Sequence, residues 1–274
     1  MSLGWAEYTG QEIERDSWNE CVNLLLSVGD SNALYRGHAS FDWKLETTLE
    51  RALQAHAQQF DDRKYQLMRS AVSDRETENW ANGVENDLTR YFRRNAARFG
   101  VPDLPEAWDL LGWWELMQHH GAPTRLMDWS QSPFTALWFA LEEHTDGSGD
   151  MALWIYDRRN GEINHHNAFN ELRNTDVHGI LDDRQRQNRL VQLILEEANS
   201  NPALLPVTPR QFPRSVAQQS VFTVSPSIGV NRPAHWWIRK KLATRVRLRE
   251  EWKAEMWASC RSMGLTRPSR TFGQ

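Results

Sequence analysis

The segment from Gln118 to Ala140, QHHGAPTRLMDWSQSPFTALWFA, constrains the fold most, because it joins a dense group of polar side chains to a very apolar stretch. Leu, Trp and Phe at this density predict burial, and a buried polar group without a hydrogen-bond partner costs about 1–3 kcal/mol. The polar side chains that enter with them must therefore be partnered. Either they brace a buried turn or they line a pocket.

Apolar spacing predicts helices over residues 11–28, 44–58, 106–120, 132–143, 188–199 and 250–264, and two more over 60–99 that are hinged near Asn82-Gly83. Short extended patterns predict strands at 32–38, 150–157, 219–225 and 241–250. Ser132-Pro133 is typical of a helix N-terminus. Few strands between long helical stretches predict one α+β domain over residues 31–274, with a helix of residues 1–30 packed on it.

Composition narrows the class of protein. The chain has 274 residues, 40% of them hydrophobic, and 14 Trp, which favours a globular protein over a disordered one. It lacks an apolar run of the roughly 18 residues that span a bilayer, and its first residues lack the pattern of a secretory signal. We therefore expect a cytoplasmic protein without membrane contact. Cys21 and Cys260 are expected to be free thiols.

Charge is distributed unevenly along the chain. The formal net charge is −4, yet residues 232–274 hold eleven basic residues against three acidic ones. Such a basic end suits a phosphate-bearing or acidic partner, or it forms a solvated surface. Trp236 and Trp237 beside Arg239, Lys240 and Lys241 either stack on bases or lie in the core beside a basic strand.

Three segments carry a family resemblance. LYRGH at 34–38, QHHGAPTRLMDWSQSPFTALWFA at 118–140 and AQQSVFTV at 217–224 resemble the signature segments of the FRG domain family, named for its Phe-Arg-Gly motif. Tyr35 replaces the Phe of that motif. With its spacers, the resemblance covers roughly residues 31–267.

The same three segments are also similar, more weakly, to ADP-ribosyltransferases of the Arg-Ser-Glu type. This resemblance implies a split antiparallel sheet with long helical insertions, and NAD as the substrate. It implies that Arg36, Ser130 and Gln218 are catalytic: Arg36 anchors the diphosphate or ribose, Ser130 orients the ribose, and Gln218 holds its 2′-hydroxyl. Arg36 has an alternative role in a buried ion pair with Asp128, and Ser130 or Ser132 has one as a helix cap.

Five further residues are candidates for binding NAD: His119, His120, Thr124, Arg125 and Asp128. Adjacent histidines on a helix point about 100° apart and rarely hold one ion, so we expect no metal. One histidine contacts a base or ribose, or else both are core residues. The alternative for Thr124, Arg125 and Asp128 is a mutual hydrogen-bonded brace.

These residues predict an NAD-dependent mono-ADP-ribosyltransferase or an NAD glycohydrolase, of the kind found among toxins and defence effectors, with a protein or nucleic acid as the acceptor. The third segment has Gln218 and Gln219 where the transferase pattern has Glu, and an amide cannot offer a negative charge to the oxocarbenium-like ribose that NAD cleavage creates. Asp128 or another acid is a candidate substitute. The alternative is a non-catalytic module that binds a nucleotide or nucleic acid in the same cleft.

Overall fold

The computed structural model of the chain describes residues 9–28, 32–59, 75–101, 103–196, 205–207, 220–228 and 234–265. Within these ranges the strands form a mixed seven-stranded sheet in the order β1-β7-β4-β2-β3-β6-β5. The strands are β1 (Glu12–Ile13), β2 (Ala33–His38), β3 (Leu126–Ser130), β4 (Met151–Asp157), β5 (Leu205–Val207), β6 (Ser220–Val224) and β7 (Ala243–Leu248). The α+β class is confirmed. The sheet is not antiparallel throughout, because β1 runs parallel to β7.

The sheet consists of two groups of strands, each called a ladder below, and a single residue pair joins the two groups. β2 pairs with β4 along all six of its residues, and β3 pairs with β6 along all five of its residues. Between β2 and β3, in contrast, Tyr35 opposite Ser130 is the one registered pair. The first ladder is β1-β7-β4-β2, the second is β3-β6-β5, and the two diverge away from this joint.

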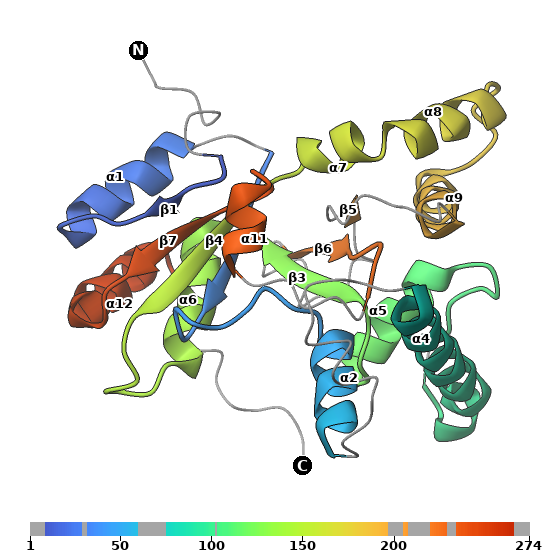
Figure 1. Cartoon of the computed structure of the whole chain (residues 1–274), viewed down its shortest axis with the longest axis horizontal. Coiled ribbons are helices and arrows are strands. Elements are labelled where there is room, and N and C mark those ends of the chain that lie inside the picture. Colours follow the sequence, from blue (N-terminus) through green and yellow to red (C-terminus); the bar gives the residue numbers. More distant parts are fainter. Residues whose placement is uncertain are drawn as a thin grey trace.

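Three helices cover one face of the first ladder: α1 (Trp18–Val28), α6 (Pro133–Glu143) and α12 (Lys253–Ser262) (Figure 1). Their apolar side chains share a core with Tyr35 and Leu153. On the other face, Leu34 and Trp154 pack with Trp237 of α11 (Ala234–Arg239). Because β1 and α1 belong to this sheet and core, residues 12–28 are continuous with the rest of the fold.

The second ladder packs against α5 (Leu110–His119), α8 (His166–Thr175) and α9 (Asp183–Glu196). Helices α7 (Arg159–Asn164), α8 and α9 form the long helical insertion between β4 and β5 (Figure 1). Asn188 of α9 fixes the start of α5, since it donates to Asp109 Oδ1 at 2.8 Å and accepts from the Leu111 amide at 3.0 Å. Helices α2 (Thr48–Gln59) and α4 (Arg75–Ala96) pack around Ile228.

Several local predictions are confirmed. The strands expected at 32–38, 150–157, 219–225 and 241–250 appear as β2, β4, β6 and β7. Ser132 Oγ accepts from the Thr135 amide at 3.3 Å, and Pro133 occupies the first turn, so the predicted start of α6 is correct. Short 3-10 turns at Ala97–Phe99 and Glu250–Trp252 follow α4 and precede α12.

Five local predictions are wrong in whole or in part. The helix expected over 11–28 begins at Trp18, because residues 12–13 pair with β7 as a strand. The helices expected over 44–58 and 106–120 begin at Thr48 and Leu110. The hinge near Asn82-Gly83 is absent, since α4 runs through both residues, and residues 60–74 lie outside the described ranges. The basic segment around Arg239 is a helix, α11, and not a strand.

Both cysteines are buried and free, as predicted. Burial raises the pKa of the Cys21 thiol to about 11, and that of the Cys260 thiol also to about 11. Both thiols therefore remain protonated and inert at neutral pH. Within the described ranges, none of the helices combines the length and apolar character that crossing a bilayer requires.

Candidate functional site

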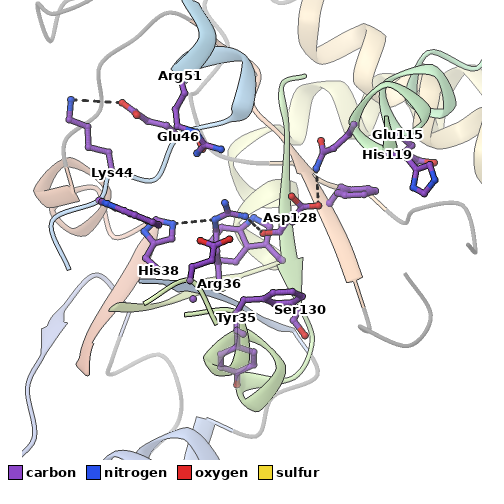
Figure 2. A pocket seen from close by; sticks show the side chains of 18 residues that line it. Tyr35, Arg36, His38, Lys44, Glu46, Arg51, Glu115, His119, Asp128 and Ser130 are labelled. Atoms are coloured by element: carbon purple, nitrogen blue, oxygen red, sulfur yellow. Dashed lines mark hydrogen bonds and ion pairs between the residues drawn. The ribbon is translucent and has the colours of Figure 1, made fainter. Parts of the chain in front are cut away.

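A pocket of about 700 Å³ lies where the two ladders diverge (Figure 2). Strands β2 and β3, helices α5 and α6, and the segment that leads into α2 supply its walls. The side chains used below are Arg36, His38, Trp43, Gln118, His119, Asp128, Ser130, Phe139 and Glu143. The joint between the ladders thus coincides with a cavity of the size typical for small-molecule sites.

Arg36 spans the divergence between β2 and β3. Its Nη1 donates to the backbone carbonyl of Asp128 at 2.6 Å, and its Nε donates to His38 Nε2 at 3.2 Å (Figure 2). Within the described residues, Nη2 has no hydrogen-bond partner, so it remains available to a ligand. Arg36 is partly buried; this burial lowers its pKa, and the nearby Asp128 carboxylate opposes the change. The guanidinium still carries its charge at neutral pH.

His38 is the acceptor that orients Arg36. It is buried with an exposed fraction of 4%. Burial, reinforced by the charge of Arg36, lowers its pKa from 6.5 to about 3. The imidazole is therefore neutral at physiological pH, and its Nε2 keeps the lone pair that accepts from Arg36.

Gly37 allows α6 to lie directly on β2. A Cβ atom at this position would lie 1.9 Å from the Ala136 carbonyl oxygen and 2.9 Å from the Ala140 Cβ atom. Only glycine accommodates this approach. The Arg-Gly pair of the first segment therefore has two separate physical roles: the arginine bridges the ladders, and the glycine seats the helix that forms one wall of the pocket.

Gln118 and Asp128 form a hydrogen-bonded part of the wall. Gln118 Nε2 donates to Asp128 Oδ1 at 2.8 Å, and Gln118 Oε1 accepts from Thr124 Oγ1 at 2.6 Å. Thr124 is completely buried, and its backbone carbonyl accepts from the Leu49 amide at 3.1 Å. Thr124 thus acts behind the pocket, whereas Asp128 is exposed and lines it.

Arg125 lies away from the pocket, with an exposed fraction of 2%. Its Nε is 2.8 Å and 2.9 Å from the two carboxylate oxygens of Glu85 on α4, and its Nη2 also pairs with Glu85. Further bonds reach Asn82 and the carbonyls of Ser225 and Pro226. Arg125 is thus a brace between α4 and the end of β6. Its partner is Glu85 and not Asp128, and Gln118 is what links Thr124 to Asp128.

The remaining predicted site residues divide into three cases. Ser130 is buried and lines the pocket, and its Oγ accepts from the Ser132 amide at 3.0 Å. His119, at the end of α5, is exposed and lines the pocket, whereas His120 is exposed and its ring lies 6.1 Å from that of Phe92. Gln218 lies outside the described residues. Its nearest described neighbour, Ser220, is opposite Ser130 in the β3–β6 ladder.

These residues coincide with a known domain. Residues 31–148 match the family model of the FRG domain. The chain carries an FRG domain. No curated protein and no solved structure matches the chain. Apart from Phe222, every side chain that lines the pocket lies within the range matched to the FRG domain, while the third resembling segment, residues 217–224, lies beyond it.

Sequence reasoning missed many side chains of the FRG-domain pocket, among them His38, Trp43 and Glu143. His38 was detectable, because it lies two residues beyond Arg36 in an extended segment and so on the same face. Trp43 has 47% of its surface exposed, and its ring centroid lies 6.1 Å from that of His38. Such an exposed ring at a pocket suits stacking on a planar ligand.

A second polar cluster lies outside the FRG-domain pocket. Ligand atoms of His144, Asp146 and Glu250 lie within 4.8 Å of one another. Lys253 Nζ contacts His144 Nδ1 at 3.0 Å and pairs with Asp146. The amides of Gly147 and Gly149 donate to Glu250. An ammonium group thus already supplies the positive charge that this cluster needs.

The basic excess near the C-terminal end is neutralised in part by acidic residues elsewhere in the chain. Arg245 pairs with Glu12, and Arg247 pairs with both Glu14 and Asp150. Both guanidinium groups also lie over the Phe41 ring, at 3.8 Å and 3.7 Å. Arg239, Lys240 and Lys241 are exposed instead and have no ion pair within the described residues.

Proposed function

We propose that the FRG-domain pocket binds NAD and that the chain is a mono-ADP-ribosyltransferase or an NAD glycohydrolase. One observation carries the proposal: Arg36, Ser130 and His119, from three separate elements, converge on one pocket at the joint of the sheet. The pocket combines a guanidinium with one uncommitted nitrogen, the exposed ring of Trp43 and several carboxylates. NAD offers matching groups, namely a diphosphate, planar rings and a positively charged nicotinamide.

In the proposed reaction, the bond between ribose C1′ and the nicotinamide nitrogen breaks, and its electron pair leaves with neutral nicotinamide. Water or an acceptor then adds to the ribose cation and loses its proton to solvent. Arg36 binds the diphosphate through Nη2 while Asp128 and His38 hold its other nitrogens in place. Ser130 orients the ribose, His119 closes the wall, and Gln218 holds the 2′-hydroxyl.

The test measures NAD binding and nicotinamide release by the purified chain, with and without protein and nucleic-acid mixtures as acceptors. Arg36→Ala is expected to lower the rate about 100-fold or more, as does loss of one preorganised donor elsewhere. Arg94→Ala is the matched control, because Arg94 is exposed on α4 and does not line the pocket. A chain that neither binds nor cleaves NAD, with all variants folded, would overturn the proposal.

Gln218→Glu tests whether the third segment belongs to a catalytic site or to a non-catalytic nucleotide-binding module. If Gln218 lies beside the ribose, a carboxylate there should raise the rate, because it adds the negative charge that an amide lacks. NAD binding without cleavage by either form would favour the non-catalytic nucleotide-binding module. If the chain is an NAD-cleaving enzyme, we propose that it acts in the cytoplasm as a toxin or defence effector.

A further inference from the structure

Helix α6 presents one row of side chains to the pocket. Ala136, Phe139 and Glu143 are spaced by three and four residues, so they lie on the same face of the helix. All three line the pocket. Gly37 brings this face against β2, because its lack of a Cβ atom admits the Ala136 carbonyl. The close contact between Gly37 and α6 thus fixes the position of Glu143 relative to β2.

Glu143 differs from the other carboxylates of the pocket. Glu46 accepts from Gln54 at 3.0 Å, Glu115 accepts from Arg184 at 2.9 Å, and Asp128 accepts from Gln118 at 2.8 Å. Within the described residues, Glu143 has neither a hydrogen bond nor an ion pair. It is nevertheless near enough to Arg36 for the two charges to interact. It is therefore the pocket carboxylate that is available to a ligand.

The location of Glu143 in its helix is locally unfavourable. It is the last residue of α6, and the last turn contains no basic residue. The helix dipole places partial negative charge at this end, which disfavours a carboxylate there and favours a cation. Residues that break a local rule in this way concentrate at functional sites. The partial negative charge at the end of α6 thus adds to that of the Glu143 carboxylate, which lines the pocket.

We propose that Glu143 is a catalytic residue whose carboxylate faces the ribose cation formed when the C1′–nicotinamide bond breaks, in place of the Glu that the third segment lacks. The inference rests on the proposed NAD-cleaving function. Glu143 takes no proton in this step. It stabilises the positive charge that passes from the departing nicotinamide to the ribose, while Arg36 holds the diphosphate on the opposite side.

The first test compares Glu143→Gln with Glu142→Gln. Glu142 is the preceding residue, is also exposed, lies at the same helix end and does not line the pocket. Glu143→Gln should lower kcat for nicotinamide release about 100-fold while the Kd for NAD changes less than threefold, because the charge matters most in the transition state. Glu143→Asp should retain part of the activity. Glu142→Gln should match the unmodified chain in both quantities.

A second test does not depend on turnover. A cationic iminoribitol resembles the ribose cation, and its neutral tetrahydrofuran counterpart does not. The unmodified chain should bind the cationic compound at least tenfold more tightly, and Glu143→Gln should abolish that preference. If the unmodified chain binds and cleaves NAD and Glu143→Gln does so equally well, the role of Glu143 is wrong and the proposed function stands. If the unmodified chain does not bind NAD, both fail.

Discussion

Arg36 replaces a backbone contact between two strands with a side-chain contact. Its Nη1 donates to the Asp128 carbonyl at 2.6 Å, beyond the point where β2 and β3 cease to pair. The Asp128 carbonyl therefore has a partner from β2, although the backbone of β2 is not in register with Asp128. The same guanidinium holds the two ladders at a fixed separation and offers Nη2 to the cavity between them.

Gly37→Ala should destabilise the fold and disturb the pocket. The added Cβ atom would meet the Ala136 carbonyl oxygen at 1.9 Å, which is backbone and cannot rotate away. We expect a loss of at least about 1–3 kcal/mol in the free energy of unfolding, measured by urea titration. Gly83→Ala in α4 is the control, because nothing lies within 4 Å of its added Cβ atom. It should stabilise by about 0.5–1 kcal/mol.

Arg125→Met should cost about 3–5 kcal/mol of stability, because it leaves the Glu85 carboxylate buried without its partner. Replacing both residues by apolar ones, Arg125→Met with Glu85→Leu, should recover most of that loss. The exposed pair of Arg90 and Asp87 on the same helix serves as the control, and Arg90→Met should cost less than about 1 kcal/mol. Equal losses for Arg125→Met and Arg90→Met would contradict the brace.

The free energy of unfolding should decrease as the pH is lowered, because of His38. The unfolded imidazole takes up a proton near pH 6.5, whereas burial and Arg36 hold the folded pKa at about 3. Below pH 6.5 the unfolded state binds more protons, so the free energy of unfolding falls, by up to about 1.4 kcal/mol per pH unit from this group. Urea titrations at pH 7.5, 6.5 and 5.5 should show a shallower decline for His38→Gln. Identical slopes would refute the assignment.

Nucleic acid, as acceptor or ligand, should bind through Arg239, Lys240 and Lys241. These side chains are exposed, whereas Arg245 and Arg247 are engaged with carboxylates and Phe41. Neutralising the three residues should lower the slope of log affinity against log salt concentration by about 2–3, as expected for three phosphate contacts. Arg247→Gln should leave that slope unchanged. An unchanged slope in the triple variant would assign these residues to a solvated surface.

The sequence predicts local structure where a residue acts on its own segment. Ser132 and Pro133 determine the start of α6 through their own backbone chemistry, and alternation with apolar flanks identifies β4. Glu12 and Ile13 have no such local signal. They form a strand because β7 offers an unpaired edge, and β7 lies more than two hundred residues away. Local periodicity therefore extends the helix too far.

The site is predictable to the same degree. The three segments indicate that Arg36 and Ser130 matter, and both line the pocket. That Arg125 faces Glu85, while Thr124 and Asp128 meet through Gln118, depends on how α4 and α5 pack. Glu143 is not predictable from the sequence for a similar reason. An acidic residue at a helix end is common, and only the packing of α6 on β2 places this one at the pocket.

The order of strands also determines when this sheet can form during synthesis. β1 leaves the ribosome well before its partner β7, because Glu12 and Arg245 are 233 residues apart. β4 can pair with β2 once residue 157 has emerged, but β1 must wait until residues 243–248 are translated. Until β7 is translated, a nascent chain therefore carries Glu12, Glu14 and Asp16 as an acidic segment without its basic partners, and these charges keep the segment soluble until the arginines of β7 emerge.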